Sequence, residues 1–386
     1  MVRGFKYRFY PTPDQKRILA RTFGSVRYVY NRALDLRSTA WRERNELISY
    51  NASSSALTEW KRSPETVWLN EVSSVPTQQS LRHLQTAFVN FWKHGAKYPT
   101  FKSRHGHQSA EFTRSGFQWD GETLTLAKIG ALDIRWSREF TAQPSTVTVS
   151  RTPAGRYEVS IRVDEPLAVM PKAVGQIGID LGLTTFATIS TGVKFDAPRP
   201  LRTKMERLKA AQKRLSRRVK GSRNRAKARL QVARMHQKIG DTRKDFLHKT
   251  STKLVRENQA IAVEDLNVSG MVANHTLAGA ISDSSWSEFV RQLEYKCEWY
   301  GRAFVKIGRF VPSSKRCSQC GNTVEAMPLD IREWSCGVCG AHHDRDVNAA
   351  VNIRDEAFRG GTRPISLPSE PCGNAAGNRN RLVNCA

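Results

Sequence analysis

Apolar side chains recur at helical spacing in the N-terminal third of the chain. Residues 13–48 place them every three to four positions, which predicts an amphipathic helix. These apolar positions are Ile18, Leu19, Phe23, Val26, Tyr30 and Leu34. A second helix is predicted near residues 77–95, where Leu81, Leu84, Phe88, Phe91 and Trp92 share one face. Residues 3–10 instead alternate basic and aromatic side chains, which predicts a short strand that ends at Pro11.

The pattern changes to a period of two after about residue 100. Residues 146–149 and 157–163 alternate apolar and polar positions on either side of Pro153-Ala154-Gly155, which predicts a β-hairpin. Shorter strands are predicted at Leu124, Leu126, Leu132, Ile134 and Trp136. Residues 1–10 and about 110–168 are therefore expected to form a small β-barrel, with the helices inserted between its strands.

The second half of the chain alternates strands and helices. Strands are predicted at residues 175–190, around Ile261 and Val263, and at residues 304–307. Two helices separated at Gly221-Ser222 are predicted between residues 199 and 258. Ser285 and Glu288 have the spacing of a capping box, so a helix is expected to begin at Ser285.

The chain of 386 residues is strongly basic, with 62 Lys and Arg against 35 Asp and Glu and a formal net charge of +27. Residues 199–258 alone contain 21 basic and four acidic residues. A charged run is often only a solvated helix face, but helices this basic would repel themselves without a polyanion, which favours nucleic acid as the partner. No apolar run approaches the roughly 18 residues that a membrane span needs, and we expect a cytoplasmic, nucleoid-associated protein.

Four cysteines have the spacing of a structural zinc site. Cys317 and Cys320 form one C-x-x-C pair, and Cys336 and Cys339 form a second pair after 15 intervening residues. Two disulfides are the alternative, but nothing in the chain resembles a secreted protein, and the cysteine usage fits a reducing cytosol. Four thiolates already complete a tetrahedral shell, so His342 and His343 are expected at the surface or beside the site.

Three carboxylates from different elements are candidates for a catalytic metal site. Asp180 is flanked by Ile179 and Leu181 in a buried strand, where an unpaired carboxylate is costly; turn amides or a metal could satisfy it. Glu264 ends the next buried strand, and a helix start follows the cysteines at Asp344-Arg345-Asp346. Either aspartate there could instead be an N-cap. Carboxylates from three elements suit Mg²⁺, or Mn²⁺, and in a basic chain they indicate a nuclease of the ribonuclease-H-like fold.

The order of these motifs resembles the TnpB-type transposon-encoded nucleases, which are similar to the RuvC-like half of type V CRISPR effectors. GIDLG contains Asp180, VEDL contains Glu264, WSEFVRQLEYK precedes the cysteine pairs, and DRDVNAA contains Asp346. The resemblance extends from the N-terminal YRFYPTP to Ile353. It implies cleavage of double-stranded DNA beside a short adjacent motif, directed by a guide RNA from the transposon end, and it selects Asp346 over Asp344 as the third catalytic acid.

The resemblance also implies a domain organisation and further site residues. Residues 1–10 and 103–170 would form an oligonucleotide-binding-type β-barrel, residues 11–102 an inserted helical recognition domain, residues 171–310 and 341–358 the RuvC-like domain, residues 311–340 the zinc ribbon, and residues 359–386 a disordered tail. Tyr50, Gln78 and Thr113 lie in the stretches that would read the adjacent DNA motif, and Arg217 and Arg218 would contact phosphates. The protein would act as a monomer with its RNA.

Three other functions compete with this interpretation. A DNA-transposing recombinase shares the fold, but its glutamate comes last, whereas the order here is Asp180, Glu264, Asp346. A nuclease-inactive RNA-guided repressor, or an accessory DNA-binding protein for transposition, would keep the basic surfaces but not all three acids. A plain zinc-ribbon DNA-binding factor explains the charge but leaves the acids without a role.

Overall fold

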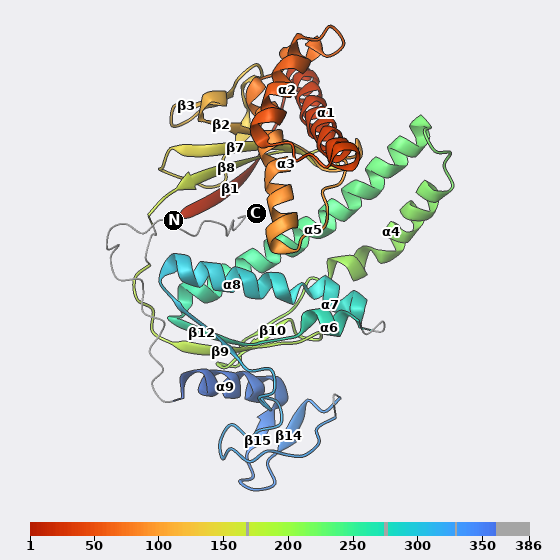
Figure 1. The fold of residues 1–386 in the computed structure, drawn as a ribbon. Helices are drawn as coiled ribbons and strands as arrows, with labels where there is room; N and C mark the ends of the chain where they lie inside the picture. Colours follow the sequence, from red (N-terminus) through yellow and green to blue (C-terminus); the bar gives the residue numbers. More distant parts are fainter. Residues whose placement is uncertain (167–169, 274–276, 329, 360–386) are drawn as a thin grey trace. The chain divides into compact units, whose positions relative to one another are not determined.

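The computed structural model describes residues 1–166, 170–273, 277–328 and 330–359 (Figure 1). Residues 1–166 form one compact unit, and the described residues from 170 onward form a second. The predicted disordered tail lies outside the described residues, except for Arg359.

Unit 1 is built on a five-stranded antiparallel sheet with the order β2-β7-β8-β1-β6. A three-stranded sheet of order β3-β4-β5 accompanies it. The strands are β1 (Val2–Phe9), β2 (Gln108–Thr113), β3 (Phe117–Trp119), β4 (Leu124–Leu126), β5 (Gly130–Ala131), β6 (Ile134–Arg135), β7 (Pro144–Arg151) and β8 (Tyr157–Asp164). The predicted hairpin is confirmed as β7 and β8. No described pairing joins β2 to β6, so the hydrogen-bonded sheet is open, and closure into a barrel stays a prediction.

The alternation in β1 explains how unit 1 buries its core. Phe5, Tyr7 and Phe9 point to one face and are buried with the apolar positions of β7 and β8. Leu19 and Phe23 of α1 (Pro13–Arg44) pack against the same cluster. Thr12 caps α1 in a capping box with Gln15, and the helix therefore begins where Pro11 ends the strand region.

The predicted helix over residues 13–48 is too long. Asn45 adopts a left-handed conformation (φ 52°), which ends α1 at Arg44. A helix that was not predicted follows, α2 (Tyr50–Arg62), so Tyr50 begins a helix instead of lying between helices. The sequence of α2 is rich in Ser, Asn and Thr and has few apolar positions, which weakens its periodicity. The predicted second helix is confirmed as α3 (Ser74–His94), after the short 3₁₀ turn η1 (Val67–Glu71).

Unit 2 contains a mixed five-stranded sheet with the order β11-β10-β9-β12-β13. Its strands β9, β12 and β13 are parallel, whereas β10 and β11 are antiparallel to their neighbours. The bounds are β9 (Gln176–Leu181), β10 (Ala187–Ile189), β11 (Lys194–Phe195), β12 (Ala260–Glu264) and β13 (Ala303–Ile307). Helices α5 (Arg223–Glu257) and α8 (Trp286–Tyr300) cover one face of this sheet, and α9 (Arg345–Phe358) covers the other (Figure 1).

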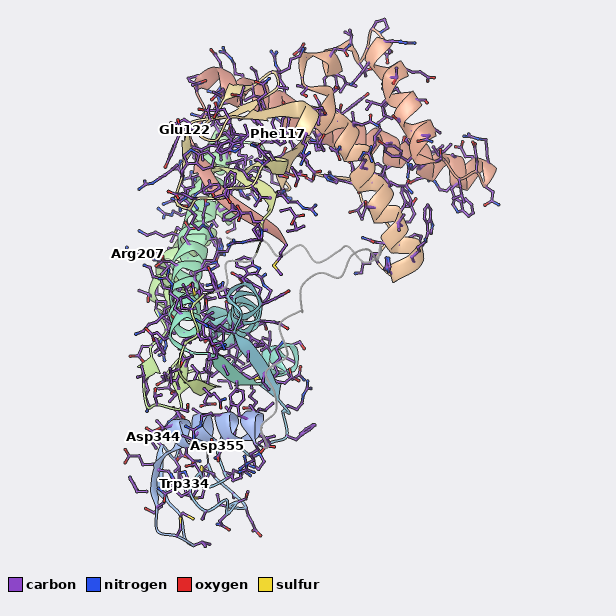
Figure 2. The ribbon with its side chains drawn as sticks, turned by 90° about the vertical axis from the view of Figure 1, so that its left-hand side faces the viewer. Phe117, Glu122, Arg207, Trp334, Asp344 and Asp355 are labelled. Atoms are coloured by element: carbon purple, nitrogen blue, oxygen red, sulfur yellow. The ribbon has the colours of Figure 1, made fainter. Side chains whose placement is uncertain are left out.

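The basic segment forms the predicted helix pair, because α4 (Pro200–Ser216) ends before Gly221 and Ser222 caps α5. Leu208, Ala211, Val232 and Ile239 form the apolar seam between them. Most of the basic side chains face solvent, as Arg207 does in Figure 2. The two helices are therefore held by a narrow core and present a cationic exterior.

The predicted capping box at Ser285 is wrong. Ser285 has a positive φ of 56°, and its side chain makes no capping hydrogen bond to α8. Two short helices, α6 (Val268–Val272) and α7 (Ala278–Ser284), come before α8, and Ser285 forms the junction between α7 and α8. Glu288 consequently bonds to Arg291 and Gln292 within α8.

Candidate functional site

Small residues let helix α9 lie directly on one face of the unit 2 sheet. Along β9, Ile177 and Ile179 point into the core beneath α5 and α8, whereas Gly178 points toward α9. A Cβ atom at Gly178 would lie 2.1 Å from the carbonyl oxygen of Ala350. Ala262 of β12 contributes to the α9 face in the same way, in a cluster with Ile353. Only residues with small side chains, or none, let the backbone of α9 lie this close to β9 and β12.

The same alternation places Asp180 and Glu264 beside each other on the α9 face. In the parallel ladder Ile179 lies opposite Val263, and each acid is the next residue of its strand. Side chains at matching positions of parallel neighbours point to the same face. The two carboxylates therefore meet at the carboxyl ends of β9 and β12. Asp180 lies near the end of its strand, not at its centre as the sequence suggested.

The first turn of α9 brings Asp346 to this edge of the sheet. Asp344 is the N-cap: its carboxylate accepts a hydrogen bond of 2.9 Å from the Val347 amide and one of 2.6 Å from Lys194. Burial would raise the pKa of Asp344, but the Lys194 and Val347 hydrogen bonds outweigh it and hold the pKa below its usual value. Of the two candidate aspartates, Asp346 is therefore the one that lacks the capping role.

The three acids share a common electrostatic field. Burial, followed by the charges of Asp346 and Glu264, raises the pKa of Asp180 to about 7. Burial and the adjacent Asp265 also raise the pKa of Glu264. Compensating positive charge comes from Arg345 near Asp180 and from Arg332, whose guanidinium lies 3.7 Å from the Asp346 carboxylate. Sequence reasoning missed Lys194 and Arg332, because neither belongs to a motif or lies near its acid along the chain.

The acid cluster has a chemistry suited to hard divalent cations. Its donors are carboxylate oxygens, which Mg²⁺ and Mn²⁺ prefer, and their crowding is the kind of like-charge repulsion that a cation relieves. A cleft of about 200 Å³ adjoins Glu264 and is lined in part by Asp265, Arg291 and Lys306. Of the three acids only Glu264 lines this cleft, whose remaining wall comes largely from α8 on the face of the sheet opposite α9.

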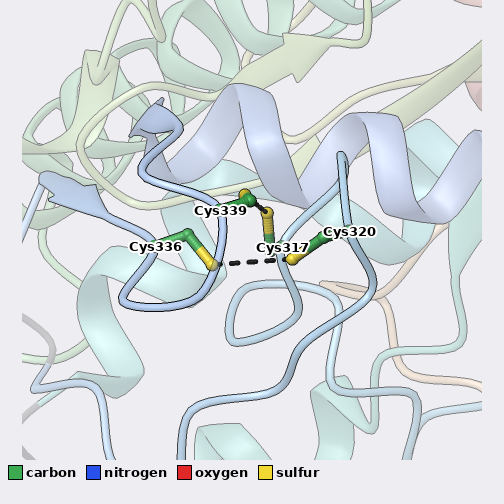
Figure 3. A group of neighbouring side chains, drawn as sticks. All are labelled: Cys317, Cys320, Cys336 and Cys339. Carbon is green, nitrogen blue, oxygen red and sulfur yellow. Dashed lines mark hydrogen bonds between the residues drawn. The ribbon is translucent and has the colours of Figure 1, made fainter.

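The four predicted cysteines form the tightest ligand cluster among the described residues (Figure 3). Their sulfur atoms all lie within 4.8 Å of one another; Cys317 and Cys339 are 3.7 Å apart, and Cys320 and Cys336 are 3.6 Å apart. A tetrahedron with Zn–S bonds of 2.3 Å has edges of about 3.8 Å. The residues present therefore fit a structural zinc ion.

Each cysteine pair is shaped by a tight turn. Gly321 and Gly340 have φ values of 79° and 72°, and their amides donate to the carbonyl oxygens of Cys317 and Cys336. The amides of Cys339 and Val338 point at the Cys336 sulfur and lower its pKa to about 6. His343 is buried with its Nε2 atom 3.1 Å from the Cys317 sulfur, whereas His342 is exposed. The expectation that the histidines lie at the surface or beside the site is confirmed.

The cysteine segment includes a short hairpin of β14 (Glu333–Ser335) and β15 (His342–Asp344), and we call residues 311–344 the ribbon. The ribbon is fastened to α9, while the predicted domain bounds of 311–340 stay a prediction. The side-chain amide of Asn352 donates to the carbonyl oxygens of Ser313 and Arg316. Asn348 donates to Arg316 and accepts from the Ser318 amide. Figure 2 shows Trp334 of the ribbon close to Asp344 at the start of α9. The cysteine cluster therefore supports the helix that carries Asp346. The DRDVNAA motif contains Asn348, but nothing in the sequence revealed its role.

The predicted DNA-reading residues partly come together in unit 1. The Gln78 side-chain amide donates to the Tyr50 hydroxyl at 2.6 Å and to Ser54 at 2.8 Å. Thr113 ends β2, and no hydrogen bond links it to this group in the described residues. Arg217 and Arg218 are exposed in the connection between α4 and α5. A polar cluster of Tyr50, Ser54 and Gln78 thus exists, and its role stays a prediction.

Three family models match successive parts of the chain. Residues 1–46 match a "Helix-turn-helix domain", residues 157–275 a "Probable transposase" of the OrfB_IS605 type, and residues 286–353 a "Cas12f1-like, TNB domain". A Streptomyces pristinaespiralis protein called "Putative RNA-guided DNA endonuclease" is 54% identical over 91% of this chain and 88% of its own. InsQ of Escherichia coli K12, which has the same description, is 34% identical over 91% of both chains.

The chain belongs to the TnpB family. Its fold agrees with this assignment: it resembles the protein in a Cas12f1-sgRNA-target DNA complex with a TM-score of 0.55, at 14% identity, over 92% of this chain and 98% of that one. The likeness supports the RuvC-like α/β fold expected for TnpB proteins. None of the helices in the described ranges has the length and apolarity needed to span a membrane.

Proposed function

We propose that this TnpB-family protein is a transposon-encoded RNA-guided DNA endonuclease. A guide RNA derived from the transposon end would direct it, as a monomer, to double-stranded DNA beside a short adjacent motif. One observation carries the proposal: Asp180, Glu264 and Asp346 converge at one edge of the sheet, and the charges of the other two acids help raise the pKa of Asp180. The descriptions of both relatives agree with this function.

These three carboxylates are the groups that would hold Mg²⁺. When bound, the metal supplies a nucleophilic water and stabilises the charge on the leaving oxygen of the phosphodiester. The protein's own contribution is to hold the carboxylates near one another and fixed in direction. Lys194 and the Val347 amide hold Asp344 at the helix start, so the first turn of α9 presents Asp346 in a fixed orientation. Arg332 provides a cation beside Asp346 that could contact a phosphate.

The nucleic-acid partners follow from the charge of the chain. Arg217 and Arg218 belong to the exposed basic exterior of α4 and α5, which suits phosphate contacts without sequence preference. Guide pairing would provide most of the sequence information, with the Tyr50, Gln78 and Thr113 region reading a short flanking duplex. The zinc ribbon would act structurally, since Asn348 and Asn352 fasten it to α9.

The test is programmable cutting. The protein is copurified with its RNA, the guide segment is replaced, and cleavage of a plasmid library with randomised flanks is measured with Mg²⁺. We expect the cut site to follow the new guide and to need one flanking motif. Guided binding without any cutting would instead identify a nuclease-inactive repressor.

Substitution of the acids refines this test. Asp180→Asn, Glu264→Gln and Asp346→Asn should each lower cutting at least about 1,000-fold while RNA binding is retained, because each removes a metal ligand but little volume. Asp344→Asn and Asp355→Asn are matched controls on or beside the same helix, and Asn preserves the N-cap at residue 344. If Asp344→Asn abolished cutting and Asp346→Asn did not, Asp344 would be the metal ligand.

A further inference from the structure

A cluster of aromatic side chains is exposed where helix α3 ends. We call Trp41, Phe91, Trp92, Tyr98 and Phe101 the aromatic patch; their side chains are between 37 and 59% exposed. All five lie in unit 1, away from the Tyr50 and Gln78 cluster in sequence and outside every motif already assigned. Large apolar side chains gathered in water usually mark a surface that another molecule covers.

Ring contacts join three members of the patch, Phe91, Trp92 and Tyr98. The buried Phe88 ring lies 5.3 Å from Trp92 and 5.6 Å from Tyr98, and Phe91 lies 5.3 Å from Tyr98. The Tyr98 hydroxyl bonds to the Ser38 hydroxyl at 2.8 Å, which links the patch to α1. Trp41 lies three residues after Ser38, on the same helical face. Phe91, Trp92 and Tyr98 are therefore one connected group linked to α1, and Trp41 and Phe101 flank it in sequence on α1 and in the segment after α3.

The segment that carries Tyr98 and Phe101 is fixed to α1. Asn31 bonds to both the amide and the carbonyl oxygen of Lys102, at 2.8 and 3.0 Å. The Lys102 ammonium also lies 4.0 Å from the centre of the Tyr30 ring. Gly95, in a left-handed conformation, ends α3 and turns the chain back along α1. The backbone beside Tyr98 and Phe101 is therefore fixed to α1 before any partner binds.

The segment that carries four of the five rings has charges of a single sign. No acidic residue occurs from Asn90 to Ala110, whereas Lys93, Lys97, Lys102 and Arg104 fall within this stretch. Lys93, Lys97 and Arg104 are exposed. Exposed rings interleaved with cations are the combination that single-stranded nucleic acid uses, with bases stacked on the rings and phosphates near the cations.

We propose that the aromatic patch binds unpaired bases of single-stranded RNA by stacking. This inference rests on the proposed function in one respect, that the protein carries a guide RNA. Folded RNA displays unpaired bases in loops and ends, which are its usual recognition elements. A guide RNA also stays bound between rounds of cutting, and a lasting partner suits rings that would otherwise remain in water. The DNA strand that is cut suits the patch less well, because it must reach the acids of unit 2 and leaves after the reaction.

The test uses the purified full-length protein from which its own RNA has been removed. Binding of a single-stranded RNA made only of uridine is measured. A single-stranded DNA of the corresponding sequence and a blunt RNA duplex are measured for comparison. The combined variant Trp92→Ala and Phe101→Ala should lose at least about tenfold in affinity for the single-stranded RNA, because each stacked base depends on a ring. Its affinity for the duplex should stay within about twofold. Trp68→Ala is the matched control, since Trp68 is an exposed tryptophan that packs on Tyr28 outside the patch.

A second pair of substitutions separates stacking from apolar packing. Trp92→Leu and Phe101→Leu keep apolar side chains but remove the π-faces, so the same loss is expected with an unchanged melting temperature. Unchanged affinity for single-stranded RNA in both combined variants would overturn the proposal. So would a loss confined to single-stranded DNA, or self-association of the wild-type protein that these variants abolish, which would identify a second copy as the partner. Guided cutting by the wild-type protein is measured in parallel, so failure of the proposed function is scored separately.

Discussion

The cysteine cluster and the acid cluster of unit 2 are assembled in opposite ways. The four cysteines come from two short turns within one ribbon, and their sulfur atoms lie within 4.8 Å of one another. The three acids come from β9, β12 and α9, and the described residues do not bring their oxygen atoms into so tight a group. The cysteines meet because of local turns, whereas the acids meet only when the sheet and α9 have packed.

This difference determines what holds each site. The cysteine turns depend on Gly321 and Gly340, which supply the left-handed backbone that each knuckle needs. The acids depend on distant small residues such as Gly178, which allow α9 to reach the sheet. A bound zinc ion would therefore contribute most to the stability of the ribbon, whereas side-chain packing sets the geometry of the acid site. Four measurements test this contrast.

Zinc loss should have the largest effect and should be local. Cys317→Ser should abolish copurification of about one zinc ion per chain, because metal binding supplies the folding energy of such a small unit. Hydrogen exchange should then become fast across residues 313–343 and stay slow in β9 and β12. Cys297→Ser, at a buried cysteine of α8 outside the cluster, should keep the zinc. If the ribbon of the zinc-free variant stayed fully protected from hydrogen exchange, zinc would not be what holds it folded.

Gly178→Ala should damage the acid site through packing alone. The added Cβ would lie 2.1 Å from the Ala350 oxygen and 2.5 Å from the Arg354 nitrogen, both backbone atoms of α9. We expect the free energy of unfolding to fall by about 3 kcal/mol or more. Most of the cutting activity should be lost, whereas the zinc content should not change. Gly240→Ala, where nothing lies within 4 Å, is the matched control. Wild-type cutting by Gly178→Ala would show that α9 tolerates displacement.

Asp180→Asn should stabilise the metal-free protein at high pH. The folded-state pKa of Asp180 is raised to about 7 from 3.8, so the folded state binds more protons than the unfolded state between these values. Stability therefore falls as pH rises from about 4 to 7, and the variant avoids a cost of roughly 2–4 kcal/mol. Thermal melts in EDTA should show an advantage that grows across this window and levels off above pH 7. A pH-independent advantage would mean that charge is not its cause.

Gln78→Ala should have the smallest effect, confined to DNA choice. If Gln78 reads a base, its loss should cost about 1–3 kcal/mol at one flanking position and relax the preference there. Arg217→Ala should instead weaken binding to every sequence and flatten the salt dependence. A randomised flanking library distinguishes the two. An unchanged preference in Gln78→Ala would leave the Tyr50 and Ser54 contacts as a purely structural link between α2 and α3.

The sequence was most informative where structure is local. The cysteine turns, the hairpin of β7 and β8, the strands of unit 2 and the break at Gly221-Ser222 each follow from a short pattern. Helix α2 was missed because its contacts with α3 come from tertiary structure. The capping box at Ser285 failed because α7 ends there and fixes a left-handed backbone, which spacing does not encode.

The candidate acids could be chosen individually, but not their surroundings. Burial cost singled out Asp180, and family resemblance was needed to separate Asp344 from Asp346. Lys194 and Asp344 are 150 residues apart in sequence, so no local pattern predicts that they bond to each other. The roles of Asn348 and Asn352 could not be predicted for the same reason, because the carbonyl oxygens that accept their hydrogen bonds lie in the ribbon.

The position of α9 along the chain has a consequence for synthesis. The strands with Asp180 and Glu264 leave the ribosome well before the ribbon, and Asp346 follows only after Cys339, the last cysteine of the cluster. A nascent chain can therefore complete the basic helices, and begin to engage RNA, before it has a third acid. In the proposed nuclease, cutting would become available only after the ribbon and α9 are complete, so the order of translation would let RNA bind before the protein could cleave DNA.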